Sequence, residues 1–425
     1  MIYVYRYFVW PILKMAFFIL RFFNRKMARG WEMRNEMDHG LRPWQRGLSG
    51  RRPVWFHCAS GEFEYAKPVL ELFRNKHPLV PTLVTFFSPS IESAILNSKL
   101  VDIGVPLPWD TVQSWREFHD HYQPRALLIA RTDTWPEMLY QAKLRGVPSL
   151  LFSATLTESS GRSRAFARPI SRWIFSMLNE IFCVSANDFK NFDNLGVGAR
   201  SKIAGDTRFD QVQSRLKNLK ALKDEQFLGT NARFIAGSTW PEDEAVLIHS
   251  IAASRSPIEW VLVPHEPTDD HLRNLEAQLD RLSISHRRYS NPVRESKVLL
   301  IDQVGILAEL YGKGKFAFVG GSFRKTVHSV MEPLAAGCLT FVGPKIQNNR
   351  EAIEFSKLSL RPACDFSPVV ICETSEQLRE TLEKAFATFN DQASEMIRHE
   401  IHLRSNQSQK VADWIDSQLN DQHCE

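Results

Sequence analysis

Residues 54–76 read VWFHCASGEFEYAKPVLELFRNK, and this stretch predicts the fold of the domain that contains it. The run VWFHCAS is apolar and rich in strand-forming residues, whereas EYAKPVLELFRNK has the spacing of an amphipathic helix, despite Pro68 near its start. A turn of small residues, Ala59 to Gly61, joins them, and Glu62 stands where the helix should begin. We therefore expect a strand–turn–helix unit with a carboxylate at the turn.

The same alternation continues along the chain in two blocks. Further strands are expected in the first block at residues 82–88, 125–131, 147–155, 181–187 and 201–206. Those of the second block are expected at 232–239, 258–265, 297–302, 316–322 and 339–344. Helix-like segments separate most of them. Apolar strands bounded by helices predict parallel sheets covered on both faces.

The chain is therefore expected to be α/β, with two Rossmann-like doubly wound domains, since 425 residues suit two domains of usual size. A polar, Lys-rich stretch over 213–231 is the expected linker. The expected divisions are an apolar anchor, two Rossmann-like domains and a C-terminal helix: 1–29, 30–215, 216–395 and 396–425. Ligands of such sheets bind beyond the carboxyl ends of the strands, and two domains in tandem place the site in the cleft between them.

The net charge of +5 is unevenly distributed. Residues 1–52 hold eleven Lys and Arg against three Asp and Glu, a balance of +8, so the remainder carries about −3. A basic segment on a near-neutral body favours an anionic surface as its partner, and nucleic acid is not expected. The six cysteines form no C-x-x-C pair, which favours buried thiols in a reducing compartment over a metal site.

The N-terminal segment MIYVYRYFVWPILKMAFFILRFFNRKMAR is rich in aromatic and aliphatic residues. It is long enough to span a bilayer, but Arg6, Lys14 and Arg21 make spanning costly. An interfacial helix would place its apolar face in the lipid and its basic groups at the headgroups. We expect a membrane anchor with the basic flank in the cytoplasm. A helix docked on the protein itself is the alternative.

Two carboxylates follow strands of the first block. Glu62 is a candidate general base at the rim of a cleft, or else an acid that favours the start of its helix. Glu64 is the competing acid, but on a helix it points away from the side of Glu62. Asp133, in ARTDTWPEML, is a second carboxylate at the same edge, or an N-cap-like acid before Trp135-Pro136.

Three shorter motifs each admit a structural interpretation. Arg208, in AGDTRFD, is placed to hold a phosphate or carboxylate, although a surface pair with a neighbouring Asp is the simpler interpretation. The turn GSTWPEDE at 237–244 offers backbone N–H groups to an anion, as many turns without ligands also do. His265, in VPHEP, is either a surface residue or a contact to a base or sugar.

The stretch FVGGSFRKTVHSVMEPLAAGCLTFVGP at 318–344 carries the strongest site signal. Gly320-Gly321-Ser322 follow a strand and permit close backbone approach, and a helix is expected to start near His328-Ser329. Glu332, in the first turn of that helix, can accept two ribose hydroxyls. This layout is typical of a nucleotide-sugar site, with an ordinary strand–loop–helix crossover as the alternative.

Taken together, these motifs resemble those of the 3-deoxy-D-manno-octulosonic acid (Kdo) transferases. ASGE, TDTWP, GDTRFD, the Gly-Ser-Thr loop, PHEP and HSVMEP stand in the family's order and spacing over roughly residues 50–350. The resemblance implies a GT-B architecture at the cytoplasmic face of the inner membrane. It implies inverting transfer of Kdo from CMP-Kdo to a lipid A precursor in lipopolysaccharide synthesis, without a metal or other cofactor.

The resemblance also implies roles for individual residues. Glu62 matches the catalytic base, and Asp133 and Arg208 match groups that stabilise the transition state. The first domain would bind the acceptor and the second the CMP-sugar. The matched CMP-binding positions are Pro264, His265, Val304, Gly305, Ile306, Ser329, Val330, Met331 and Glu332.

This chain departs from the family pattern at three donor-binding positions. His265 replaces an Arg, Ile306 an acid and Ser329 an Asn, which indicates a divergent member with an altered sugar or acceptor. Two alternatives remain: another GT-B enzyme, such as a UDP-sugar transferase or epimerase, and an inactive membrane-bound scaffold that binds nucleotide sugars. Retention of Glu62 argues against the scaffold.

Overall fold

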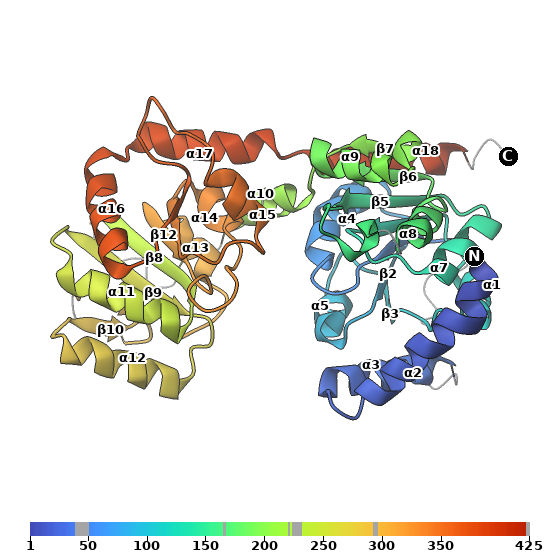
Figure 1. Ribbon diagram of the computed structural model, residues 1–425, viewed down its shortest axis with the longest axis horizontal. Helices are drawn as coiled ribbons and strands as arrows, with labels where there is room; N and C mark the ends of the chain where they lie inside the picture. The colour runs from blue at the N-terminus through green and yellow to red at the C-terminus, as the bar shows by residue number, and fades with distance from the viewer. Residues whose placement is uncertain (39–50, 165–166, 220–221, 223–231, 292–295, 422–425) are drawn as a thin grey trace. The chain divides into compact units, whose positions relative to one another are not determined.

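The computed structural model describes residues 1–38, 51–164, 167–219, 222, 232–291 and 296–421. The chain forms two compact units (Figure 1), residues 1–211 with 404–425, and residues 212–403. The expected boundary at 215/216 instead falls within helix α10 (Arg208–Lys217), which also occupies the start of the expected linker. The rest of that linker lies largely outside the described residues.

The first unit is built on a seven-stranded parallel sheet with the order β3-β2-β1-β4-β5-β6-β7. Its strands are β1 (Val54–His57), β2 (Thr82–Phe86), β3 (Ile103–Pro106), β4 (Ala126–Ala130), β5 (Ser149–Ala154), β6 (Glu180–Cys183) and β7 (Ser201–Ile203). Every residue of β1, β2, β4 and β5 is buried. Continuous burial explains why these strands are apolar runs and do not alternate with polar residues.

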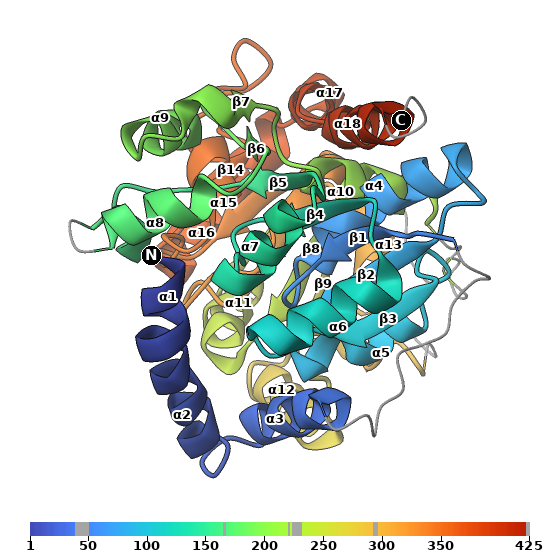
Figure 2. The ribbon, with the colours of Figure 1, turned by 90° about the vertical axis from the view of Figure 1, so that its right-hand side faces the viewer.

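Helices cover both faces of this sheet (Figure 2) and enclose two separate apolar clusters. Its α-helices after the N-terminal segment are α4 (Phe63–Lys76), α5 (Glu92–Leu96), α6 (Val112–Tyr122), α7 (Pro136–Leu144), α8 (Arg168–Phe175), α9 (Ala186–Asn194) and α18 (Gln407–Asp421). Trp55 of β1 packs in one cluster and Phe56 in the other, because successive strand residues point to opposite faces.

The second unit repeats the architecture with the order β10-β11-β9-β8-β12-β13-β14, again parallel. Its strands are β8 (Ala232–Thr239), β9 (Ile258–Pro264), β10 (His286–Arg288), β11 (Val298–Leu300), β12 (Phe316–Val319), β13 (Leu339–Val342) and β14 (Val369–Ile371). Its helices are α11 (Pro241–Ala253), α12 (Asp269–Arg281), α13 (Leu307–Tyr311), α14 (Met331–Ala336), α15 (Arg350–Phe355), α16 (Ser375–Thr388) and α17 (Asp391–Leu403). The prediction of two Rossmann-like domains is confirmed.

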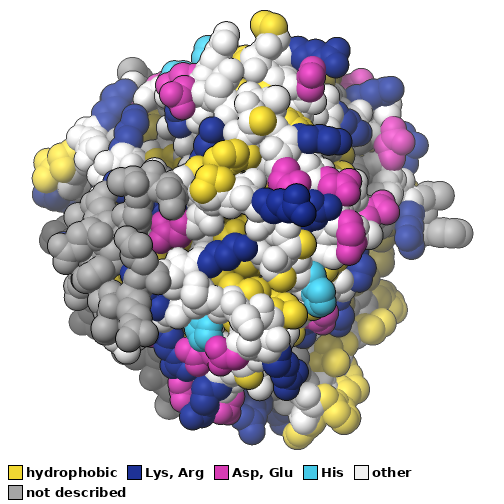
Figure 3. Space-filling model, turned by 90° about the vertical axis from the view of Figure 1, so that its left-hand side faces the viewer, with side chains coloured by type: hydrophobic (Ala, Val, Ile, Leu, Met, Phe, Trp, Pro, Cys, Tyr) yellow, Lys and Arg dark blue, Asp and Glu magenta, His cyan; other side chains and the backbone are white. Residues whose placement is uncertain are grey.

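Three strands that the sequence did not predict, β3, β10 and β14, each lie at an edge of a sheet. They are short, and β10 reads HRR without a buried residue. β10 and β14 each have one neighbour and need less apolar character than a central strand, so their sequence signal is weak, whereas β3 is buried but only four residues long. The face shown in Figure 3 carries interspersed basic and acidic side chains, as expected of an ordinary solvated surface.

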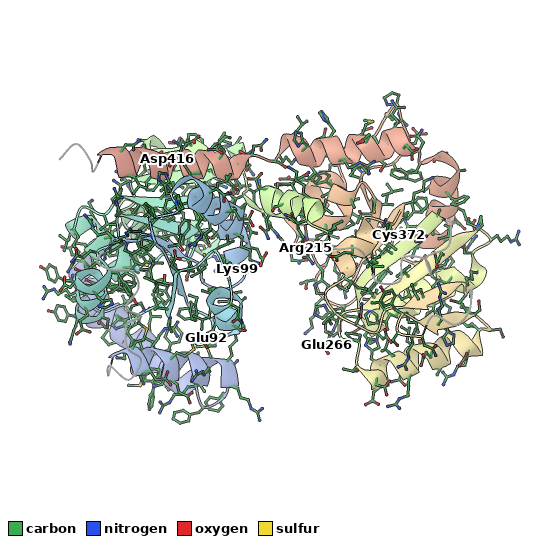
Figure 4. All side chains as sticks on the ribbon, turned by 180° about the vertical axis from the view of Figure 1, so that it is seen from behind. Glu92, Lys99, Arg215, Glu266, Cys372 and Asp416 are labelled. Carbon is green, nitrogen blue, oxygen red and sulfur yellow. The ribbon has the colours of Figure 1, made fainter. Side chains whose placement is uncertain are left out.

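The C-terminal segment forms two helices, where the sequence predicted one over 396–425. α17 belongs to the second unit, whereas α18 returns to the first unit and packs against α4. Asp210 accepts hydrogen bonds from the backbone N–H groups of Asn406 and Ser408 at the start of α18. Asp416 of α18 (Figure 4) pairs with Lys76 and His77 at the end of α4.

The N-terminal segment forms one continuous helical rod over Ile2–Leu20, followed by α3 (Arg25–Asp38) (Figure 2). The rod consists of α1 (Ile2–Val4), a π-helical stretch (Tyr5–Val9) and α2 (Trp10–Leu20). The π turn lies directly before Pro11, which has no N–H to donate, and a local widening of the helix accommodates its ring. By length and composition this helix could cross a membrane.

One face of this rod is docked on the first unit. The Tyr5 hydroxyl donates to Asp110 Oδ2 at 2.6 Å, and Arg6 forms two bonds to Glu137, Nε to Oε2 at 2.7 Å and Nη2 to Oε1 at 2.8 Å. Trp10 packs against Trp109. Burial raises the pKa of Asp110 to about 6, although four hydrogen-bond donors favour its charged form. The docked-helix alternative is therefore correct for this face.

The opposite face of the rod is apolar and exposed. Tyr7, Phe8, Ile12 and Met15 are each more than half exposed. Just beyond the rod, Phe23 is 82% exposed. Contiguous apolar surface of this kind marks a contact with another apolar phase or partner. The rod is thus held by the protein on one side and presents apolar side chains on the other.

Arg6→Met tests the docking of the rod. The Glu137 side chain has no exposed area, so removing its cation leaves a buried carboxylate with Gln141 as its remaining side-chain partner. We expect the first unit to lose about 3 kcal/mol of stability in chemical denaturation, and the rod to become sensitive to proteases. The double variant Arg6→Met/Glu137→Gln should recover most of that loss. An equal loss in both variants would contradict the ion-pair account.

Candidate active site

The turn after β1 presents Glu62 at the carboxyl edge of the first sheet. Glu62 occupies the N-cap position of α4, but its carboxylate bonds no N–H of the helix. Instead Oε2 accepts the backbone N–H of Ser60 at 2.7 Å, which closes the turn and holds the carboxylate. A Cβ atom built on Gly61 would meet nothing within 4 Å, so the space beside the turn is open to a ligand.

Asp133, after β4, is joined to the end of β1. Its Oδ2 lies 3.0 Å from Nε2 of His57 and accepts the indole N–H of Trp135 at 3.2 Å. Burial opposes the charge of Asp133, but these hydrogen bonds and the attraction of Arg162 hold its pKa below the usual value. Trp135, not Asp133, is the N-cap residue of α7. Asp133 is therefore an ionised group at the same sheet edge as Glu62.

The ring of Tyr65 makes cation–π contacts with two arginines. Arg131 Nη1 donates to the Tyr65 hydroxyl at 2.9 Å, and the guanidinium carbons of Arg131 and Arg208 lie 5.0 and 5.7 Å from the ring centroid. Arg208 opens α10, where its backbone N–H bonds Asp206 at 2.9 Å. Because Tyr65 stands one turn after Glu62, these contacts place the positive charges of Arg131 and Arg208 close to the candidate base.

The sequence interpretation missed His57, Tyr65 and Arg131. Arg131 has a φ of +70°, a left-handed conformation that is rare for a side chain of its size. Such strain persists where the surroundings demand it, and it clusters at functional sites. Their positions in the sequence could have indicated them, because His57 ends a buried strand and Arg131 directly follows one.

In the second unit, the Gly-Gly-Ser turn is bonded within the protein. Asp243 of α11 accepts the N–H groups of Trp240, Gly321 and Phe323 at 3.0, 2.7 and 3.1 Å. The hydroxyl of Ser322 is buried, donating to Val319 and accepting from Gly343. The expectation that the turn at 237–244 offers free N–H groups is therefore wrong for Trp240, because the buried carboxylate of Asp243 accepts its N–H.

The glycine of this turn has a packing role. A Cβ on Gly320 would lie 2.1 Å from the backbone oxygen of Ser238, so only glycine lets β12 approach the end of β8. Whether Gly320, Gly321 and Ser322 also contact a donor stays a prediction.

Beyond this turn lies a stack of rings. His265 lies parallel to His328 with centroids 4.6 Å apart, and against Trp240 at 4.8 Å. Trp240 Nε1 donates to His328 Nε2 at 3.1 Å, and the Arg324 guanidinium lies 4.0 Å from the Trp240 ring centroid. Burial is the main cause that lowers the pKa of His328, and the nearby His265 adds to the shift. Flat rings at a strand end suit stacking with a base or sugar.

Helix α14 begins at Met331, later than the expected start at His328-Ser329. The backbone of His328 is committed to the loop, since its N–H bonds Gly320 and its carbonyl accepts from Asn349. Glu332 lies in the first turn, as expected, and its Oε1 accepts from Nη1 of Arg215 (Figure 4) at 2.5 Å. Among the remaining donor positions, Gly305 has a φ of +92°, which favours glycine, and Val304 beside it is exposed.

Comparison with known proteins relates the chain to one family. Residues 30–211 match the family model described as 3-deoxy-D-manno-octulosonic-acid transferase (kdotransferase). The first unit of the chain is therefore similar to the Kdo transferases. The chain is 28% identical to 3-deoxy-D-manno-octulosonic acid transferase of Aquifex aeolicus over 313 residues, covering 71% of this chain and 79% of that protein. The 3-deoxy-D-manno-octulosonic acid transferase of Rickettsia felis is 24% identical over 311 residues, covering 71% of this chain and 66% of that protein.

Solved structures support the fold of the chain. A putative UDP-N-acetylglucosamine 2-epimerase from Listeria monocytogenes superimposes with a TM-score of 0.60 at 13% identity, covering 88% of this chain and 98% of that one. The UDP-GlcNAc 2-epimerase from Neisseria meningitidis superimposes with a TM-score of 0.59 at 16% identity, covering 87% of this chain and 100% of that one. Both likenesses concern the fold alone and support the GT-B class of two Rossmann-like domains.

Proposed function

We propose that the protein transfers Kdo from CMP-Kdo to a hydroxyl group of a lipid A precursor, with inversion at the anomeric carbon. The observation that carries the proposal is Glu62, held by the N–H of Ser60 beside an open glycine at the edge of a Kdo transferase family domain. A carboxylate so placed can take the acceptor's proton. Several curated relatives are named as transferases of this sugar, which supports the donor assignment.

The proposed step is a single displacement. The acceptor oxygen forms a bond to the anomeric carbon of Kdo while the bond from that carbon to the phosphate oxygen breaks, and CMP leaves with the electron pair. Glu62 receives the proton of the acceptor hydroxyl. Arg208 would oppose the negative charge that develops on the departing phosphate, and Asp133 would keep the neighbouring cations oriented. We propose that no metal or other cofactor takes part.

Donor recognition is proposed for the second unit. Arg215 orients the carboxylate of Glu332, which suits a bidentate contact to ribose hydroxyls. His265, in its ring stack, would lie against the nucleotide, with Pro264, Ser329, Val330 and Met331 beside it. UDP-sugar chemistry remains the second candidate, because epimerases named for UDP-N-acetylglucosamine share the fold.

We further propose that the rod Ile2–Leu20 lies in the interface of the inner membrane, at its cytoplasmic face. Spanning the bilayer would separate Tyr5 and Arg6 from Asp110 and Glu137, and leave two buried carboxylates without these partners. In the plane of the interface, the docked face keeps those bonds and the apolar face enters the lipid. The basic residues after the rod favour anionic headgroups.

Glu62→Gln tests the function together with the base. Purified protein, CMP-Kdo and a tetra-acylated lipid A precursor should give a lipid product heavier by one or more Kdo residues in mass spectrometry. The amide cannot take a proton, so we expect turnover at least ~100-fold lower, with CMP affinity unchanged. Glu64→Gln, two residues along, is the control and should act like the native protein. Transfer only from UDP-sugars would reject the proposal.

Glu332→Ala tests the ribose contact. Two hydroxyls without their acceptor cost roughly 1–3 kcal/mol, so calorimetry should show CMP binding ~5- to 150-fold weaker. Glu354→Ala, on an exposed glutamate of the same unit that pairs with Arg350, is the matched control and should bind CMP normally. Equal CMP affinity in all three proteins would show that Glu332 does not contact the ribose.

Ile12→Asp tests the membrane contact. Ile12 is 70% exposed on the apolar face of the rod, and Leu144 is 61% exposed elsewhere in the first unit. In flotation with vesicles that contain anionic lipid, we expect Ile12→Asp to lower the bound fraction several-fold, because a charge then enters the apolar interface. Leu144→Asp should float like the native protein. Equal flotation of both variants would contradict the assignment of this face.

A further inference from the structure

A pocket of about 290 Å³ lies between the N-terminal helices and the turn that carries the candidate base. Phe17 of α2, Trp31 of α3, and Phe87 and Trp109 of the body supply aromatic walls. Ala59 and Ser60 form another part of the wall, and Ser60 is the residue whose N–H holds Glu62. The pocket therefore connects the proposed membrane contact to the proposed site of reaction.

The pocket contains a buried cation. Arg34 is 3% exposed, and it donates to the carbonyls of Gly30 and Phe87 at 2.7 and 2.8 Å. Within the described part of the chain, no carboxylate lies within ion-pair distance of its guanidinium. Burial lowers the pKa of Arg34 to about 10, and the negative charge of Asp133 opposes that shift.

A second cation, Lys26, lines the same pocket and is exposed. Buried charges are normally paired, so Arg34, with Lys26 beside the same apolar walls, is complementary to an anion that carries an apolar tail. A free phosphate would leave the aromatic walls uncovered, and a plain hydrocarbon would leave Arg34 without a counter-charge.

We propose that this pocket binds one acyl chain of a phosphorylated lipid, the acceptor, with its anionic group against Lys26 and Arg34. At ~30 Å³ for a group of the size of water, the volume holds roughly ten methylene groups, which is one chain and not a whole lipid. The proposal rests on the lipid acceptor of the proposed function and adds how that acceptor is selected. A chain held here draws the headgroup toward the turn of Glu62.

Direct binding tests the pocket independently of catalysis. Calorimetry below the critical micelle concentration would compare decyl phosphate, decanol and inorganic phosphate. We expect decyl phosphate to bind at least tenfold more tightly than either of the others. Met27→Trp fills the pocket and should weaken decyl phosphate at least tenfold, whereas Met15→Trp, on the exposed face of the rod, should not. Lys26→Ala should weaken decyl phosphate but not decanol.

Activity separates this proposal from the proposed function. With Met27→Trp, transfer to the acylated acceptor should fall at least tenfold, and transfer to the same acceptor without acyl chains should be unchanged. Binding of decyl phosphate without any Kdo transfer would support the pocket and reject the function. Transfer that is insensitive to Met27→Trp would reject the pocket and keep the function. If Met27→Trp lowered binding to vesicles without acceptor by the same factor as it lowered transfer, the pocket would be part of the general membrane contact. That result would overturn the proposal.

Discussion

The imidazole of His57 ties together three strands of the first sheet at the edge where the candidate site is built. Its Nδ1 lies 3.0 Å from the Thr85 hydroxyl on β2, and its Nε2 lies 3.0 Å from Asp133 after β4. His57 itself is fully buried at the end of β1. One ring thus fixes the separation of three strand ends, and the turn that carries Glu62 departs from the middle one.

Each unit uses a buried carboxylate to fix a loop at its sheet edge. In the first unit Asp110 accepts the N–H groups of Glu137 and Met138 at the start of α7, and in the second unit Asp243 accepts three N–H groups around the turn after β12. Burial raises the pKa of both acids, so both structures depend on hydrogen bonds that favour the charged form. The loops are organised before a substrate arrives.

The central strands and the fold class were predictable from sequence, because strands such as LLIA and VLV are buried on both faces and must be apolar. The edge strands were not, since HRR of β10 pairs through its backbone and needs no apolar residue. The position of Glu62 was predictable from the strand–turn–helix pattern. Its bond to Ser60, the strain at Arg131 and the capture of the Gly321 amide by Asp243 were not, because they depend on contacts between distant residues.

The docking of the N-terminal rod has a consequence for synthesis of the protein. Tyr5 and Arg6 are made before their partners, since Asp110 and Glu137 follow 105 and 131 positions later. At ~5–20 residues per second, about 6–23 s pass between the addition of Leu20, which completes the rod, and the addition of Glu137. Docking through these bonds is therefore a late event in the synthesis of the chain, and the rod depends for its place on a body that is made after it.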